Sequence, residues 1–262
     1  MNPHLIEIIV FLYGICIGSF LNVSIFRIPL GKSIISPGSS CMSCHNPVKF
    51  YDNIPILSYI ILRGKCRQCQ TPFSLRYPLT ELITGVSALF VYYRFGLSLE
   101  ALIYFTFISA LIVITFIDID HQIIPDVISL PGIPICVLLA VLRGDTTLWN
   151  SLIASMIGIL AGGGSLYLVA FTYKMFTGKE GMGGGDIKLL AMIGALVGWK
   201  GVLFTIFAGS GIGTFLGIAS MIYSKTMNMK LAIPFGPFLS LGAIIYIFFG
   251  SSIINWYFSK LI

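Results

Sequence analysis

The chain has 262 residues and a mass of 28.7 kDa, and 26 of its residues are charged: 16 Lys and Arg together with 10 Asp and Glu. Soluble domains carry about 25% charged residues, whereas this chain has 10%, with 56% hydrophobic residues. These proportions exclude a soluble globular enzyme, a disordered chain and a secreted disulfide scaffold. They predict a polytopic membrane protein.

Apolar segments long enough to cross a bilayer, about 20 residues, recur along the chain. The first has no basic n-region and no cleavage site of small residues, so we expect a span and not a removable signal peptide. No segment shows the alternation of a membrane strand. The predicted fold class is an all-α polytopic membrane protein with about eight transmembrane helices: 5–26, 77–93, 100–117, 123–142, 149–172, 187–199, 201–223 and 233–256.

The loop after the first segment contains two Cys-x2-Cys pairs separated by 21 residues. Two such pairs can close a tetrahedral shell of thiolates around zinc, which is typical of a structural site rather than a catalytic one. A disulfide is disfavoured in a reducing cytoplasmic loop, and a redox role for one pair is the remaining alternative. We therefore predict a zinc site formed by Cys41, Cys44, Cys66 and Cys69. Cys16 and Cys136 fall inside spans and are interpreted as small apolar fillers.

Acidic residues in or beside spans are costly in a bilayer, and each is therefore a functional hypothesis. Glu81 lies in the second segment, and Asp118 ends the third. We interpret Asp120, His121 and Asp126 as solvated or structural, because they belong to a stretch typical of a turn into the fourth segment. Asp118 is the main candidate of this region.

Glycine is dense in the second half of the chain. Four pairs of glycines have the four-residue spacing that lets helices approach closely: Gly158 with Gly162, Gly194 with Gly198, Gly209 with Gly213, and Gly213 with Gly217. We therefore expect these positions to lie at helix crossings.

The sixth segment opens with Asp186, directly after Gly183 to Gly185. Unwound backbone at membrane depth is tolerated where it lines a water-filled cavity, and glycine permits close approach of a substrate. Asp118 and Asp186 are expected at the same depth, and two neighbouring carboxyl groups can act as general acid and general base on a peptide bond. The residues alone leave alternatives open: the helix dipole favours an acid at a helix N-terminus, and transporters also place carboxylates at membrane depth.

The distribution of Lys and Arg predicts the orientation, because cytoplasmic loops are enriched in them. Odd-to-even connections hold twelve of these residues and the opposite side holds four. Both termini are then expected outside, with the aspartates on the cytoplasmic side, and the pI of about 9.0 reflects this bias rather than nucleic-acid binding. The predicted domains are a first transmembrane helix over 1–26, a cytoplasmic zinc-binding loop over 27–76 and a seven-helix membrane catalytic domain over 77–262.

Motifs follow one another over nearly the whole chain: Gly18–Val23 with Arg27 and Pro29, the two Cys-x2-Cys pairs, Arg76–Pro78 with Glu81, the stretch Asp118–Asp126, and Gly183–Lys188. The last fits a G-x-G-D motif with its following lysine. In this order, the motifs closely resemble those of the bacterial prepilin peptidases, or type IV leader peptidases, which are GxGD-type membrane aspartic proteases.

This resemblance implies that Asp118 and Asp186 are the catalytic pair and that Gly183, Gly185 and Lys188 belong to the active-site loop. It implies removal of the leader peptide of prepilins and pseudopilins, just after a glycine, at the cytoplasmic face of a bacterial inner membrane. Many members of the family also methylate the new N-terminal amine with S-adenosylmethionine, so this cofactor is expected besides structural zinc. The expected partners are these substrates and the lipid bilayer, with no nucleic acid.

Two alternatives stand beside this reading. Signal-peptide-peptidase-like intramembrane proteases share the G-x-G-D motif, but this chain has no Pro-Ala-Leu motif. From a different class, an ion-coupled membrane transporter with a zinc-stabilised cytoplasmic loop would also use carboxylates at membrane depth.

Overall fold

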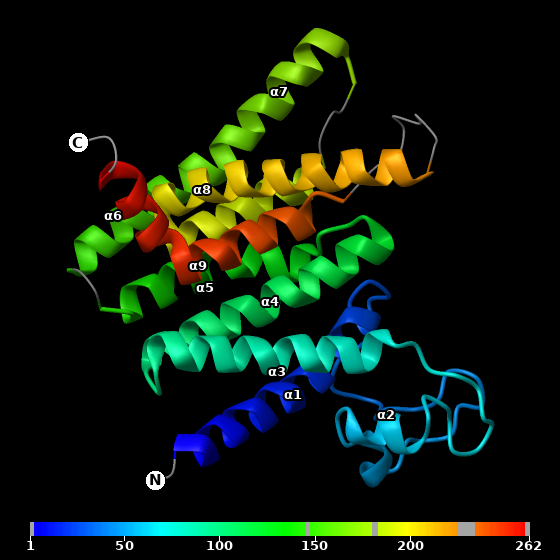
Figure 1. The fold of residues 1–262 in the computed structure, drawn as a ribbon. Helices are drawn as coiled ribbons and strands as arrows, with labels where there is room; N and C mark the ends of the chain where they lie inside the picture. The colour runs from blue at the N-terminus through cyan, green and yellow to red at the C-terminus, as the bar shows by residue number, and fades with distance from the viewer. Residues whose placement is uncertain (1–2, 145–146, 180–182, 225–233, 260–262) are drawn as a thin grey trace. The chain divides into compact units, whose positions relative to one another are not determined.

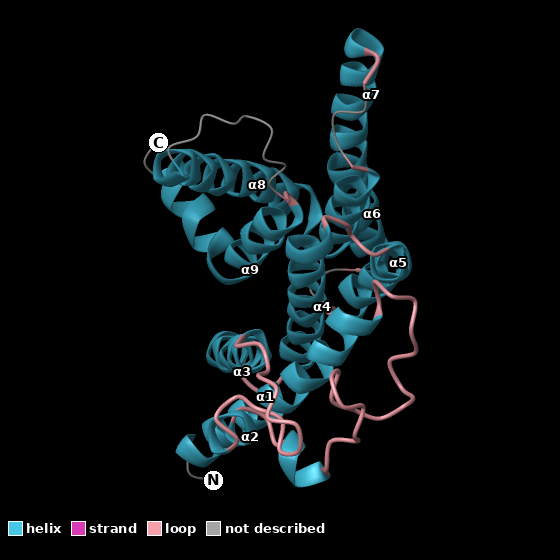
Figure 2. Cartoon of the chain, turned by 90° about the vertical axis from the view of Figure 1, so that its right-hand side faces the viewer, coloured by secondary structure: helices cyan, strands magenta, loops and turns pink. Residues whose placement is uncertain are grey.

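The structure is a computed structural model that describes residues 3–144, 147–179, 183–224 and 234–259. Within these ranges every named element is a helix, which confirms the predicted all-α class (Figures 1 and 2). Four helical stretches of the described chain are long and apolar enough to cross a membrane: His4–Arg27, Leu99–His121, Leu148–Thr177 and Gly184–Ala219.

The chain divides into two compact units, Met1–Val113 and Ile114–Ile262. The first unit contains α1 (Pro3–Arg27), the 3-10 helix η1 (Phe50–Asn53), α2 (Leu57–Ile61), α3 (Arg76–Phe95) and the first part of α4 (Leu99–His121). The second unit contains the end of α4, α5 (Asp126–Leu142), α6 (Leu148–Ile159), the π-helical turn η2 (Leu160–Gly164), α7 (Ser165–Thr177), α8 (Gly184–Ser224) and α9 (Gly236–Ser259).

In the first unit, glycines let α1 and α3 pack directly against each other. A Cβ added to Gly85 of α3 would lie 2.6 Å from Cγ2 of Ile15, and one added to Gly18 of α1 would lie 2.7 Å from Cα of Glu81. Larger residues at either glycine would push the helices apart, since small residues are what allows backbones to approach in membranes. This contact places the end of α1 beside the start of α3.

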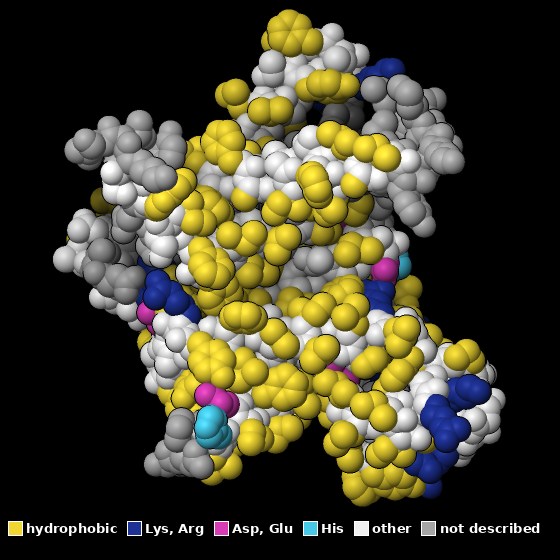
Figure 3. Space-filling model, viewed as in Figure 1, with side chains coloured by type: hydrophobic (Ala, Val, Ile, Leu, Met, Phe, Trp, Pro, Cys, Tyr) yellow, Lys and Arg dark blue, Asp and Glu magenta, His cyan; other side chains and the backbone are white. Residues whose placement is uncertain are grey.

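In the second unit, α8 is the central helix, and α5, α6 and α9 pack around it. Its first turns supply the core: Leu189, Leu190, Met192, Ile193 and Leu196 are almost completely buried. Elsewhere in the unit, large apolar side chains are exposed, among them Phe207 at 76% and Phe215 at 72%. Much of the surface seen in Figure 3 is apolar in the same way, which suits contact with lipid rather than water.

The predicted glycine crossings are confirmed at α6 and α8. A Cβ on Gly158 would collide with the carbonyl oxygen of Gly194, and a Cβ on Gly194 would collide with that of Gly158. Gly162 lies against the carbonyl of Leu190 in the same manner. The two backbones therefore touch with no side chain between them, as the small-residue spacing predicts.

Each predicted apolar segment coincides with a described helix, with ends that differ by a few residues. The segment 149–172 forms one helical stretch, in which η2 joins α6 to α7. The sixth and seventh segments are the two limbs of α8, which kinks at Gly198, where φ is 72° and ψ is 179°. The start of the eighth, residue 233, lies outside the described residues, as do Lys225, Lys230 and Lys260 of the charge count.

Candidate functional site

Asp118 lies at the buried end of α4. Ile114 and Ile117, on the preceding turn, are fully buried, and Asp118 itself is 5% exposed. Its Oδ2 accepts a hydrogen bond of 3.0 Å from the backbone N–H of Gly236, the first residue of α9. A helix N-terminus offers free N–H groups and a partial positive charge, both of which stabilise a carboxylate. Asp120, two residues later, is exposed. Of these two acids, the buried one is therefore Asp118, the residue that the resemblance assigns to catalysis.

Asp186 lies half-buried in the first turn of α8. Its backbone N–H donates to the carbonyl of Gly183 over 3.3 Å, which starts the helix. Among the described residues, a Cβ added to Gly184 would meet nothing within 4 Å, and one added to Gly183 would meet only Oδ2 of Asp186, at 4.0 Å. These two glycines therefore leave open space beside the carboxyl group. Gly185 differs, because its Cβ would lie 2.8 Å from Cβ of Ile124.

Ile124, in the turn between α4 and α5, connects the surroundings of both aspartates. Besides touching Gly185, its Cδ1 lies 3.2 Å from the Cβ position of Gly236, whose N–H binds Asp118. The carboxyl groups of Asp118 and Asp186 are near enough to interact electrostatically. Residues that 68 positions separate in the sequence are thus brought together at one end of the second unit.

The contact between Gly236 and Asp118 leaves no room for a side chain. A Cβ at position 236 would lie 2.6 Å from Oδ2 of Asp118, so Gly236→Ala must displace the carboxyl group. Because displacements of about 1 Å can cost about a hundredfold in rate, we expect a loss of peptidase activity of that order. Initial rates measured on a synthetic prepilin would test this. Gly211→Ala is the matched control, since its Cβ would meet nothing within 4 Å; equal rates for the two variants would contradict the contact.

Lys188, from the predicted active-site loop, forms an ion pair with Asp126 at the start of α5. Nζ lies 2.7 Å from Oδ1, and the side chains are 33% and 58% exposed. The pair links α8 to α5, which gives Asp126 the structural role expected for it. We propose that Lys188 positions the first turn of α8.

Exposed ion pairs contribute about 0–1 kcal/mol. Lys188→Met should therefore lower stability by less than about 1 kcal/mol and retain most of the peptidase activity, as read by thermal unfolding in detergent and by cleavage rate. Asp126→Asn should have an equal effect, with no further loss in the double variant. A folded Lys188→Met protein without activity would give the lysine a direct part in the chemistry.

The four predicted zinc ligands come together in the first unit. All four Sγ atoms lie within 4.8 Å of one another, with Cys41 3.7 Å from Cys69 and Cys44 3.9 Å from Cys66. Zn–S bonds of about 2.3 Å in a tetrahedron place sulfurs about 3.8 Å apart. The thiols are free rather than disulfide-bonded. The cluster therefore fits a closed four-thiolate zinc site.

The two cysteine turns have the same backbone geometry. In one turn, the N–H of Cys41 donates to Asn46 and the N–H of His45 donates to Cys41; in the other, Cys66 pairs in this way with Thr71 and Gln70. His45 and Gln70 occupy the same place, four residues after the first cysteine of each pair, and both have positive φ, at 57° and 58°. The loop is thus built from two copies of one metal-binding turn.

Hydrogen bonds and burial shift the pKa values of two of the four cysteines in opposite directions. The side chain and backbone of Thr71 lower the pKa of Cys69 to about 6. The backbone N–H of Asn46 lowers the pKa of Cys44. Burial and the neighbouring thiols have a larger, opposite effect, so the pKa of Cys44 is raised to about 11. Nearby, Arg67 donates three hydrogen bonds to Asp52, with the closest atoms 2.6 Å apart, and lowers the pKa of that carboxyl group. This ion pair fastens the second turn to η1.

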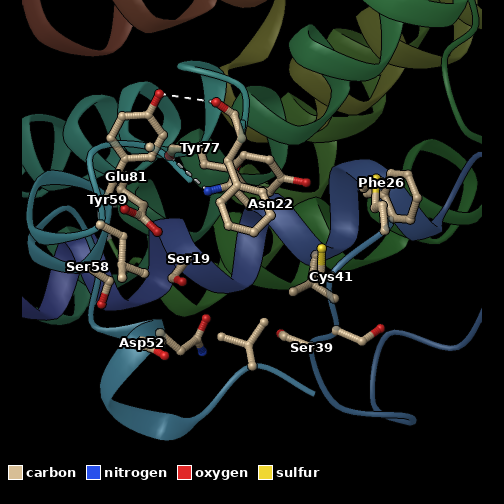
Figure 4. Close-up of a pocket in the computed structure, with 18 of the residues that line it drawn as sticks. Ser19, Asn22, Phe26, Ser39, Cys41, Asp52, Ser58, Tyr59, Tyr77 and Glu81 are labelled. Carbon is tan, nitrogen blue, oxygen red and sulfur yellow. Dashed lines mark hydrogen bonds between the residues drawn. The ribbon is translucent and has the colours of Figure 1, made fainter. Parts of the chain in front are cut away.

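The first unit also contains a cavity of about 470 Å³. Side chains of α1 and α3 line one part of it, and the cysteine loop and α2 line the rest (Figure 4). Glu81 and Asn22 in its wall are each 7% exposed. The Nδ2 of Asn22 donates to the carbonyl of Tyr77 over 3.0 Å, and Oε2 of Glu81 accepts the backbone N–H of Ile56 over 2.7 Å.

Sequence reasoning did not find Gly236, Ile124 or this cavity. The signal for Gly236 was present: the stretch Pro234–Pro237, at the beginning of the last predicted apolar segment, is typical of a helix start. For the cavity, the signals were Asn22 and Glu81, polar residues inside otherwise apolar segments.

In comparisons with known proteins, two family models match successive parts of the chain. Residues 12–95 match the family model described as the bacterial peptidase A24 N-terminal domain, and residues 105–218 match that of the type IV leader peptidase family. The prepilin leader peptidase/N-methyltransferase of Aeromonas hydrophila is 35% identical, over 97% of this chain and 94% of that protein. The protein of the same name from Pseudomonas aeruginosa is 34% identical, over 98% and 94%. No solved structure matches.

Two family models in sequence order, and relatives above 30% identity along nearly their whole length, agree with the motifs and with the paired aspartates. The chain belongs to the type IV leader peptidase family.

Proposed function

We propose that this protein is a membrane aspartic endopeptidase that removes the leader peptide of type IV prepilins and pseudopilins and then methylates the new N-terminus. The observation that best supports peptidase activity is that Asp118 and Asp186 interact electrostatically beside the open space at Gly183 and Gly184. The names of the relatives support both activities. Membership of the family favours the peptidase over the transporter that the carboxylates alone would allow.

The pair would hydrolyse the peptide bond by general acid–base catalysis. Where two neighbouring carboxyl groups interact, one can stay protonated while the other is ionised, which leaves one group as acid and the other as base. The N–H of Gly236 stabilises negative charge on Asp118, so we assign Asp118 as the base and Asp186 as the acid. Asp118 takes a proton from water as the water oxygen attacks the carbonyl carbon of the glycine, and Asp186 gives its proton to the leaving amine as the C–N bond breaks.

The helices and the charge distribution support the membrane arrangement that we propose. We propose eight spans with both termini outside, so that the loop 27–76 and both aspartates face the cytoplasm of a bacterium. A prepilin anchored by its own apolar helix would present the stretch before that helix at the same face. The division into 1–26, 27–76 and 77–262 remains the proposed functional organisation. The gap at Gly183 and Gly184 is where the extended backbone around the cleaved glycine would pass.

Zinc is the metal that the cysteine cluster suits best. Cys41, Cys44, Cys66 and Cys69 would hold it, and their spacing leaves no ligand position open for substrate. Its role is therefore to fold the loop. S-adenosylmethionine is the proposed methyl donor, because the relatives are named N-methyltransferases.

One experiment tests both activities. The purified protein is incubated in detergent with a synthetic prepilin, with and without S-adenosylmethionine, and the pilin N-terminus is read by mass spectrometry. We expect a product that begins just after the leader glycine in both samples, and one methyl group more only where the donor was added. An uncut prepilin would exclude the peptidase, and a cut but unmethylated product would exclude the methyltransferase.

A further inference from the structure

The two proposed activities need two binding sites, and the aspartates account for one. The cavity in the first unit is lined by residues between Ser19 and Glu81, so it contains neither catalytic aspartate. It also lies within the region matched by the N-terminal family model, residues 12–95. Resting on the proposed methylation, we propose that this cavity binds the methyl donor S-adenosylmethionine, with Glu81 facing its positive charge.

The cavity has the size and form of a small-molecule site. Its volume of about 470 Å³ falls within the roughly 300–1,000 Å³ that such sites occupy. Walls of three kinds surround it: the end of α1, the start of α3 and the metal-binding loop. Figure 4 shows Glu81, Tyr77 and Asn22 on one side, with Asp52 and Ser39 across from them. A ligand there would contact both the helices and the loop.

Glu81 is the strongest indication of a cationic ligand. Its carboxyl group is 7% exposed, and a buried carboxylate is costly unless hydrogen bonds and positive charge surround it. The backbone N–H of Ile56 and the side chain of Ser19 bind it, but both are neutral groups. A sulfonium or ammonium group in the cavity would supply the opposite charge.

The backbone of Ile56, in the wall of the cavity, has an unfavourable conformation. Ile56 has φ 61° and ψ −52°, a conformation that β-branched residues rarely adopt. The hydrogen bond of 2.7 Å from its N–H to Glu81 holds it there. Strained residues persist where the surrounding structure fixes them, and they gather at ligand sites. Ile56 itself lines the cavity.

The remaining walls suit the other parts of the donor. Four aromatic side chains offer faces for the adenine ring and for a cation: Phe26, Tyr59, Phe73 and Tyr77. Three cationic side chains can meet a carboxylate: Arg27, Lys32 and Lys65. A ligand with an aromatic base, a cationic centre and a carboxylate matches this combination.

Methyl transfer to the pilin balances without a further co-reactant. The lone pair of the neutral N-terminal amine attacks the methyl carbon, the C–S bond breaks with its electron pair remaining on sulfur, and the amine nitrogen then releases a proton to water. Glu81 would stabilise the charge of the bound donor and is a binding residue in this scheme.

Binding of tritiated S-adenosylmethionine to the full-length protein in detergent, without prepilin, tests the proposal directly. We expect Glu81→Gln, which keeps an acceptor for Ile56, to weaken binding at least tenfold while leader cleavage continues. Glu100→Gln, a carboxyl group of the same unit outside the cavity, and Asp186→Asn should both bind as the wild type does. Equal affinity of the Glu81→Gln and wild-type proteins would overturn the proposal.

Photolabelling of the unmodified protein with an azido-adenine analogue of the donor gives a second reading that does not depend on any variant. Label is expected on peptides from 19–81, and S-adenosylhomocysteine should compete with it. Label confined to 114–262, or complete displacement by a mature pilin N-terminal peptide, would overturn the proposal. Failure of cleavage in the wild-type protein would instead count against the proposed function, because donor binding is measured without substrate.

Discussion

Replacing either Asp118 or Asp186 with Asn should lower the rate of leader cleavage by at least about a hundredfold, the lower end of what general acid–base groups contribute. An amide can neither accept the proton of the attacking water nor return one to the amine. Since the two carboxyl groups act as a unit, the double variant should lose little more than either single variant. The measurement is the initial rate on a synthetic prepilin, with protein amounts equalised in the membrane fraction.

Asp120→Asn is the matched control, because this acid is exposed two residues after Asp118. It should cleave at close to the wild-type rate. Methyl-donor binding by Asp118→Asn and Asp186→Asn should stay unchanged, which shows that the proteins are folded. Substantial cleavage by either of these variants would remove the aspartate pair from the mechanism.

Replacing Cys41 and Cys44 together with Ser should abolish zinc binding and unfold the loop. Structural zinc contributes about 10–16 kcal/mol of apparent binding free energy to small sites of this kind, far more than the Arg67–Asp52 pair can replace. We expect metal content to fall to background and limited proteolysis to cut within 27–76. The rate of methylation should fall more than the rate of cleavage. Cys41 and Met42 line the cavity, whereas the aspartates lie in the other unit.

Cys16→Ser provides the control, since Cys16 is an exposed thiol of α1 outside the cluster. It should keep its zinc and its resistance to proteolysis. Treating the wild-type protein with a strong chelator should reproduce the double variant, and added zinc should restore methylation. Unchanged metal content in the double variant would reject the zinc site.

The sequence could predict those parts of the site that depend on residues close together in the chain. The Cys-x2-Cys spacing fixes the ligands of each turn, and the apolar run before Asp118 fixes its place at a helix end. The predicted break between the segments 187–199 and 201–223 lies beside Gly198, where α8 kinks. Each of these depends on local geometry or on the cost of charge in the bilayer.

What the sequence could not predict depends on contacts between distant segments. The hydrogen bond from Gly236 to Asp118 joins residues 118 positions apart, and no local pattern records it. Glu81 could be singled out as costly, but its partner Ile56 lies in a loop whose path the metal turns determine. The ion pair of Lys188 with Asp126 likewise could not be predicted, because it forms only once α5 and α8 are packed together.

The bond between Asp118 and the first residue of α9 also bears on when the enzyme becomes active during its synthesis. Asp118 and Asp186 emerge from the ribosome well before Gly236 does, so until α9 has inserted the first carboxylate lacks the donor that holds it. A prematurely terminated chain would therefore lack the hydrogen bond that orients this carboxylate.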